Sequence, residues 1–124
     1  MADKSILVTG GRGFIGGHLV EHMRGSSWPT RTFDVSPVAG DADGLCGDVR
    51  ELGDVRAAMD GCEGVIHLAA VSRERTGRDS PLKCIETNVL GTANILEAAR
   101  HSPMRPWIIL GSTRDVPSES YVAR

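Results

Sequence analysis

Four glycines separate an apolar segment from an amphipathic one near the start of the chain, in the stretch Thr9-Gly10-Gly11-Arg12-Gly13-Phe14-Ile15-Gly16. The apolar residues before this stretch predict a buried strand, and the pattern after it predicts a helix. A strand, tight turn and helix in this order bring backbone N–H groups and a helix N-terminus together, where a phosphate can bind. In a dinucleotide site one glycine makes the turn, another lets the backbone approach the pyrophosphate, and a third lets helix and strand pack closely. We assign these roles to Gly10, Gly13 and Gly16; the alternative is a purely structural turn.

Asp34 closes the next apolar segment, at the distance where a dinucleotide-binding fold needs an acid for the ribose hydroxyls. A carboxylate at this point repels a 2′-phosphate, so NAD is favoured over NADP. Arg12, inside the glycine stretch, could pair with such a phosphate, which keeps NADP as the lesser option. The alternative for Asp34 is a turn residue at a strand end.

A possible metal motif occurs in the helix that follows the glycines. His18, Glu21 and His22 match the inverted zinc-protease pattern H-x-x-E-H, whose two histidines share one helix face. No third ligand with a recognisable context follows, and the other face of this helix must pack on a sheet. We therefore expect an ordinary exposed helix face and no metal.

Strand-like and helix-like segments alternate along the whole chain, which predicts an α/β fold with a doubly wound parallel sheet of the Rossmann type. Helical spacing predicts burial of Phe14, Ile15, Leu19 and Met23 in the first helix, and of Ile85, Val89, Ile95, Leu96 and Ala99 in the longest one. About five strands are expected in the order 3-2-1-4-5, with the switch point between the first and the fourth. The expected strands are 5–9, 30–33, 45–46, 64–70 and 107–110, and the expected helices are about 14–23, 52–59 and 81–100.

Bulk properties exclude several classes of protein. The 124 residues, read as one domain (1–124), are enough to bury a hydrophobic core. The net charge of −2 gives no electrostatic reason to expect nucleic acid or an anionic membrane as a partner. No apolar run approaches the ~20 residues of a membrane span. The three cysteines are odd in number and widely spaced, which fits a reducing cytoplasm.

Five ordered motifs resemble the extended short-chain dehydrogenases, the NAD-dependent epimerases and dehydratases, many of which act on nucleotide sugars. The resemblance implies that Asp48 and Val49 border the adenine, that Leu68, Ala69 and Ala70 line the cofactor, and that Asn88 lies near the active site. It also places Phe14 and Ile15 in the cofactor loop. Without it, Asp48 would be read as a helix N-cap, Asn88 as a surface residue and the alanines as close-packing residues. The motifs are the stretch 9–16, Asp34, Gly47-Asp48-Val49-Arg50, His67-Leu68-Ala69-Ala70 and residues 88–99.

The catalytic motifs of the resembling family are present only in part. Gly111–Ser118 resembles the family's S-T-x-x-V-Y-G motif, with Pro117 in place of the tyrosine, so Thr113 takes the substrate-binding hydroxyl position and Ser112 lies beside it. The family's second motif is Y-x-x-x-K, but the sequence ends at Arg124, one residue before the lysine that would pair with Tyr121. A tyrosine base has an ordinary pKa of about 10 and needs a nearby cation. Tyr121 is either the family tyrosine after a shortened loop or an incidental residue.

The sequence thus predicts an incomplete dehydrogenase-type chain, because the C-terminal substrate domain of the resembling family is absent from it. It can be a fragment, a natural short protein, or a chain completed by a partner. We expect the NAD-binding portion of a nucleotide-sugar or related epimerase/dehydratase, with a small-molecule substrate; the alternative is a non-catalytic NAD-binding sensor or interaction module. Whether this chain is itself an enzyme stays open. The resemblance further implies a possible homodimer through the 81–100 helix.

Overall fold

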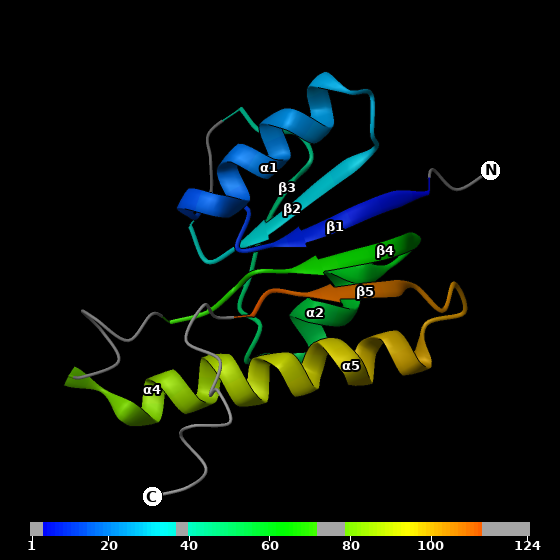
Figure 1. Ribbon diagram of the computed structural model, residues 1–124. Coiled ribbons are helices and arrows are strands. Elements are labelled where there is room, and N and C mark those ends of the chain that lie inside the picture. The colour runs from blue at the N-terminus through cyan, green and yellow to red at the C-terminus, as the bar shows by residue number, and fades with distance from the viewer. Residues whose placement is uncertain (1–3, 37–39, 72–78, 113–124) are drawn as a thin grey trace, which may run out of the picture.

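A computed structural model describes residues 4–36, 40–71 and 79–112 of the chain, and these form a parallel sheet covered by helices on both faces (Figure 1). The strand order β3-β2-β1-β4-β5 confirms the predicted 3-2-1-4-5 arrangement. The strands are β1 (Ser5–Thr9), β2 (Thr30–Asp34), β3 (Gly44–Cys46), β4 (Cys62–His67) and β5 (Trp107–Leu110). The helices are α1 (Phe14–Gly25), α2 (Leu52–Met59) and one continuous helical segment made of α4 (Pro81–Ile85), η1 (Glu86–Leu90) and α5 (Gly91–His101).

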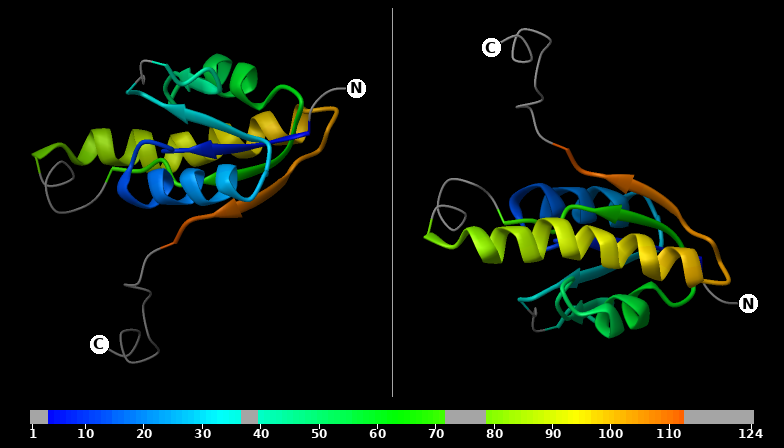
Figure 2. Two further views of the ribbon diagram at one scale, coloured as in Figure 1. Left: turned by 90° about the horizontal axis from the view of Figure 1, so that it is seen from above. Right: turned by 90° about the horizontal axis from the view of Figure 1, so that it is seen from below.

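The central strand β1 is buried on both faces, which explains its unbroken apolar sequence. Ile6 and Val8 pack towards α1, in a cluster that includes Val20 and Met23 of that helix. Leu7 points the other way, into the larger cluster formed with α2 and α5. Figures 1 and 2 show α1 on one face of the sheet and α2 and α5 on the other. The core therefore has two apolar layers separated by the sheet.

The position between β1 and β4 is where the direction of chain winding reverses. Both neighbours pair with β1 in parallel, so that Thr9 is the register partner of Phe33 on β2 and of His67 on β4. After β1 the chain crosses one face through α1, and after β4 it crosses the other face through α5. Helices that leave in opposite directions open a crevice at the carboxyl ends of these strands.

The prediction that Phe14 and Ile15 are buried with Leu19 and Met23 is wrong for the first two residues. Phe14 is 84% exposed and Ile15 is 68% exposed, whereas Gly16 and Met23 are buried. Figure 1 shows the reason: the first turn of α1 projects beyond the ends of the strands, so no sheet lies beneath it. Helical spacing identifies an apolar face, but it does not show where the supporting sheet ends.

The predicted 81–100 helix exists as the α4–η1–α5 segment, but only part of its apolar surface is buried. Ile95 and Ala99 lie in the core, whereas Ile85, Val89 and Leu96 are 56%, 64% and 48% exposed. The wide i→i+5 turn of η1 interrupts the α-helix in the middle. Seen from below in Figure 2, no described element lies in front of this helix. The prediction of burial is therefore wrong for these three side chains.

The fourth predicted strand, 64–70, begins earlier and ends earlier than expected, as β4 (Cys62–His67). Thr9 is the last residue of β1, so beyond it β4 has no central strand to pair with. Residues 68–71, which we call the β4 exit segment, leave the sheet at this point.

No helix in the described part of the chain is both long and apolar enough to span a membrane.

Candidate functional site

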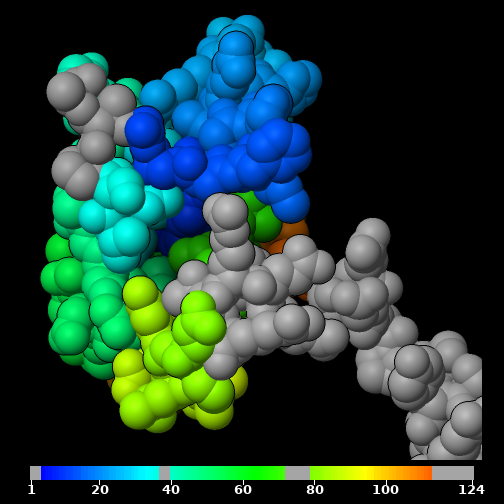
Figure 3. Space-filling view, turned by 90° about the vertical axis from the view of Figure 1, so that its left-hand side faces the viewer, coloured from blue at the N-terminus to red at the C-terminus, as the bar shows by residue number. Residues whose placement is uncertain are grey.

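The main pocket lies at the carboxyl edge of the sheet, over the switch point between β1 and β4. Its volume is about 580 Å³, within the range usual for small-molecule sites. Figure 3 looks onto this edge and shows the hollow between the blue glycine loop, the cyan end of β2 and the yellow-green start of α4. Eight of the residues predicted from sequence line it: Gly10, Gly13, Asp34, Asp48, Val49, Leu68, Ala69 and Ala70.

Two glycines hold the loop between β1 and α1 in a shape that other residues could not adopt. Gly10 has a φ of +67°, and a Cβ there would lie 2.8 Å from the backbone nitrogen of Ala69. A Cβ at Gly16 would collide with the carbonyl oxygen of Gly10. The first glycine therefore makes the turn and the third permits close packing. Gly13 faces the pocket, and a Cβ there would meet only the Gly10 oxygen at 3.3 Å.

The start of α1 provides donors for an anion. Gly13 is the N-cap and makes no side-chain cap, and the first turn carries no acidic residue. The N–H groups of Phe14 and Ile15 begin the helix, so they have no carbonyl one turn earlier within it. The helix dipole adds a partial positive charge at the same point. Phe14 and Ile15 can thus contribute to a phosphate site through their backbones, while their side chains lie outside the pocket lining.

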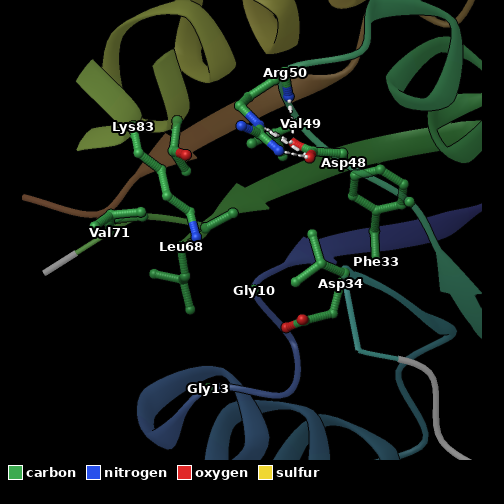
Figure 4. Close-up of a pocket in the computed structure, with 15 residues that line it drawn as sticks. Gly10, Gly13, Phe33, Asp34, Asp48, Val49, Arg50, Leu68, Val71 and Lys83 are labelled. Carbon is green, nitrogen blue, oxygen red and sulfur yellow. Dashed lines mark hydrogen bonds and ion pairs between the residues drawn. The ribbon is translucent and has the colours of Figure 1, made fainter. Parts of the chain in front are cut away.

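Asp34 points from the end of β2 towards the glycine loop (Figure 4). One carboxylate oxygen accepts the N–H of Arg12 at 3.0 Å, and the other accepts the N–H of Ser36 at 3.1 Å. These bonds fix the carboxylate at the pocket wall, while each oxygen keeps a lone pair for a further donor. Arg12 does not line the main pocket; it borders a smaller hollow beside Asp34 and Ser36.

Asp48 lies on the opposite wall in a fork-shaped ion pair with Arg50. The Arg50 Nε atom is 3.0 Å from Oδ2 of Asp48, and the backbone N–H of Arg50 donates to Oδ1 at 2.9 Å. The hydrogen bonds from the Arg50 guanidinium lower the pKa of Asp48, so this carboxylate is charged at neutral pH. Glu51, and not Asp48, is the N-cap of α2. The N-cap alternative for Asp48 is therefore wrong, and the residue borders the pocket.

Asn88 lies behind the pocket wall and not on it. Its side-chain oxygen accepts the N–H of Val71 at 2.7 Å, and its amide nitrogen donates to the Val71 carbonyl at 3.0 Å. The side chain thus replaces a strand partner for the β4 exit segment, whose Val71 lines the pocket. Asn88 is half-buried, so reading it as an ordinary surface residue is wrong.

Several lining residues were not predicted from the sequence. They come from segments far apart in the chain, which only the fold brings together around the pocket. Lys83 and Thr87 lie one turn apart on the helix that begins after Ser80, and Ser80 accepts the N–H of Lys83 as its cap. The capping signal Ser80-Pro81 could have located the helix start, but not the side of the helix that meets the pocket. Figure 4 shows the Lys83 amino group on the opposite side of the pocket from Gly13. The other missed lining residues are Phe33, Val35 and Val71; Gly47 and Arg50, which also line the pocket, belong to the motif 47–50 but had no predicted role in the site.

The predicted catalytic residues are mostly beyond the described part of the chain. Ser112 is exposed and follows β5 by two residues, outside the pocket lining. Thr113 and Tyr121 lie outside the described residues. In the described part of the chain, no three His, Cys, Asp or Glu side chains are grouped to hold a metal ion. The side chains of His18, Glu21 and His22 are all exposed.

The profile of the NAD dependent epimerase/dehydratase family matches residues 6–121. The chain belongs to this family. This confirms the resemblance to extended short-chain dehydrogenases that the five motifs indicated. The match includes the pocket-lining glycines, Asp34 and the β4 exit segment.

Relatives of known structure in the family share the fold. Uronate dehydrogenase from Agrobacterium tumefaciens superposes with a TM-score of 0.77 at 28% identity, over 95% of this chain and 49% of that one. The NAD complex of UDP-glucose 4-epimerase from Thermus thermophilus gives a TM-score of 0.69 at 30% identity, over 77% of this chain and 33% of that one.

Among curated sequences, an uncharacterized membrane protein of Methanocaldococcus jannaschii is 30% identical over 92% of this chain. The match covers 38% of that protein's length. The chain thus spans half or less of the length of each of these three relatives.

The contact between Gly16 and Gly10 gives a stability prediction. Gly16→Ala should lower the free energy of unfolding by about 2 kcal/mol, because its Cβ meets backbone that cannot move aside. Gly17→Ala is the matched control, since a Cβ there has only the Gly11 oxygen at 3.9 Å. It should stabilise the same helix by up to about 1 kcal/mol. Urea denaturation measures both, and equal effects would contradict the packing role of Gly16.

Proposed function

We propose that this chain is the NAD-binding portion of an epimerase/dehydratase that acts on a nucleotide sugar or a related small molecule. The observation that carries the proposal is the convergence, in one pocket, of the glycine loop, Asp34 and the β4 exit segment. The NAD complex of a UDP-glucose epimerase with the same fold supports both the cofactor and the substrate class. We also propose that residues 1–124 form a single domain.

Each part of the pocket suits one part of a dinucleotide. The Phe14 and Ile15 N–H groups and the α1 dipole would hold the pyrophosphate, and Gly13 leaves the space for it. The Asp34 carboxylate would accept the ribose hydroxyls, and Asp48 and Val49 would border the adenine. Bound NAD supplies a hydride acceptor and donor, while the chain supplies position and electrostatics.

We infer a preference for NAD over NADP from the position of Asp34. Its carboxylate is fixed by the N–H groups of Arg12 and Ser36, so it cannot easily turn away from a 2′-phosphate. A phosphate there would place two anionic groups side by side and raise the free energy of binding. The Arg12 guanidinium is the only element of this corner that favours NADP within the described lining residues.

Calorimetric titration with NAD and NADP tests this proposal. NAD should bind more tightly, and Asp34→Asn should weaken NAD about tenfold, because a charge-assisted hydrogen bond to the ribose is lost. The same variant should bring the two affinities closer together. Asp43→Asn, which removes an exposed charge outside both pockets, is the control and should change neither affinity.

Two outcomes would contradict this proposal. Binding of neither cofactor would exclude the NAD-binding function for this chain, and tighter binding of NADP would show that Arg12 outweighs Asp34. Calorimetry is preferred to tryptophan fluorescence, because Trp28 precedes β2 and Trp107 begins β5, at the edge of the sheet away from the pocket.

Lys83 should contribute to binding through its charge. It lines the pocket opposite the start of α1, so a pyrophosphate at the glycine loop would lie between two positive groups. Lys83→Ala should weaken NAD about threefold and reduce the dependence of its affinity on salt concentration. Lys4→Ala removes the same charge at the start of β1, at the opposite edge of the sheet, and is the control. Equal effects of the two variants would contradict a local role for Lys83.

For catalysis we propose the roles that the family motifs assign. Thr113, with Ser112 beside it, would orient the sugar oxygen that is oxidised, and Tyr121 would take its proton. The support is the family membership of residues 6–121 and the position of Ser112 two residues after β5. We also propose a cytoplasmic location, supported by the free thiols of Cys46, Cys62 and Cys84.

We propose that two copies of the chain form a homodimer through the α4–η1–α5 helix. Its exposed apolar side chains recur at intervals of three, four and seven residues, at Leu82, Ile85, Val89 and Leu96. Val89→Lys should raise the dimer dissociation constant at least about tenfold, because a charge would be buried between two helices. Light scattering across a concentration series measures this. Ile109→Lys, on the exposed edge strand β5, is the control; dissociation by that variant alone would assign the interface to β5.

A further inference from the structure

Three polar side chains lie in a row beneath the pocket, on the face of the sheet that α5 covers. Thr9 is fully buried at the end of β1, and His67 is 5% exposed at the end of β4. The Thr9 Oγ1 atom is 2.6 Å from Nδ1 of His67, and Nε2 of His67 is 3.1 Å from Oγ1 of Thr92 on α5. The pocket function proposed above does not use any of these three groups.

The surrounding donors fix the direction of every hydrogen bond in this row. Thr9 Oγ1 accepts the N–H groups of Leu68 and Ala69, both at 3.1 Å, so its own O–H must donate to Nδ1 of His67. His67 is then neutral, with its proton on Nε2, and donates to Thr92. The Thr92 O–H donates in turn to the carbonyl oxygen of Asn88 at 2.7 Å.

We propose that His67 is a positioning residue, which holds the β4 exit segment in its cofactor-binding position only while its imidazole is neutral. This inference rests on the NAD-binding function proposed above, and NAD affinity is its functional readout. Leu68 and Ala69, whose N–H groups Thr9 receives, line the pocket. Asn88, at the other end of the row, holds the next part of the same segment by its two bonds to Val71. The row therefore supports the pocket wall at both ends.

Protonation of His67 would reverse one bond in the row. An imidazolium has an N–H at both nitrogens, so Nδ1 would present a donor to an oxygen that already receives two. Thr9 would then have to turn its O–H away and give up an N–H donor. The Leu68 N–H would keep the Thr9 carbonyl oxygen at 3.2 Å as its acceptor, whereas the Ala69 N–H would be released. NAD affinity should consequently fall as the pH decreases through the lowered pKa of the buried His67 imidazole, which lies below the ordinary value of about 6.5.

No charged neighbour among the residues that the structure describes stabilises the protonated form. Burial lowers the pKa of His67 and is the only cause of the shift, so no charged group of the described residues adds to it. Its partners on β1, β5 and α5 are Thr9, Leu110 and Thr92, none of which carries a charge. Because the folded-state pKa is lowered, the neutral row is stable at and above the ordinary pKa and is lost as the pH falls.

Nitrogen-detected NMR of the wild-type chain is the first test and needs no cofactor. The His67 ring should be the neutral Nε2–H form at neutral pH, and the Ala69 amide signal should shift with the same midpoint as the ring. An Nδ1–H ring, or an Ala69 amide that ignores the His67 titration, would overturn the proposal. Both measurements remain decisive even if NAD does not bind, so failure of the proposed function is distinguished from failure of the row.

The second test compares NAD affinity from about pH 8 to about pH 5. Wild-type affinity should fall about tenfold over this range, whereas His67→Asn should be nearly pH-independent, because its amide oxygen can accept from Thr9 but does not titrate. His18→Asn is the control: His18 is exposed and lies one turn after Phe14 in α1, where its Nδ1 atom is 2.6 Å from the Phe14 carbonyl oxygen. It should retain the wild-type pH profile. Loss of the pH dependence in His18→Asn alone would overturn the assignment to His67.

A third comparison keeps the proposal testable if His67→Asn does not fold. Thr92→Val removes the acceptor of the Nε2–H group at constant shape, while Thr92→Ser keeps it. The valine variant should bind NAD about threefold to tenfold more weakly at neutral pH, and the serine variant should restore most of the affinity. Equal affinities in the two variants would show that the hydrogen bond has no positioning role.

Discussion

The close approach of α1 to the end of β1 is the contact on which the rest of the site depends. Gly16 packs against the carbonyl of Gly10, at a distance that no side chain would permit. This contact places the N-terminus of α1 over the carboxyl end of the central strand, where the helix dipole and its first N–H groups face the crevice. The same geometry carries the first turn beyond the sheet and leaves Phe14 and Ile15 exposed.

The second constraint is that the buried polar groups beneath the pocket must be paired. In the described residues no buried side-chain nitrogen or oxygen lacks a hydrogen-bond partner. Thr9 and His67 satisfy this requirement together, and their bonds direct the chain out of β4 into the pocket wall. A valine at Thr9 would suit the apolar core but would leave the Ala69 N–H without an acceptor. Polar residues at the ends of these strands thus link the stability of the sheet to the shape of the binding site.

Local patterns predicted the elements well and their buried faces less well. The bounds of β1 and β5 and the whole strand order could be predicted, because apolar runs, turns and right-handed crossovers leave few alternatives. The exposure of Val89 and Ile85 could not be predicted, since periodicity identifies an apolar face without showing whether another element covers it. The early end of β4 depended on where β1 stops, which is a relation between two distant segments.

By itself the sequence determined the glycine loop, the acid at the end of β2 and the order of the strands, because each follows from short-range spacing. Only the tertiary structure decided that Lys83 reaches the pocket, that Asn88 supports its wall from behind and that Thr9 meets His67. Thr9 and His67 are 58 residues apart in the chain and become partners through strand register. Hydrogen bonds of this kind depend on the relative position of whole elements, to within a few tenths of an ångström. Spacing along the chain carries no information at that precision.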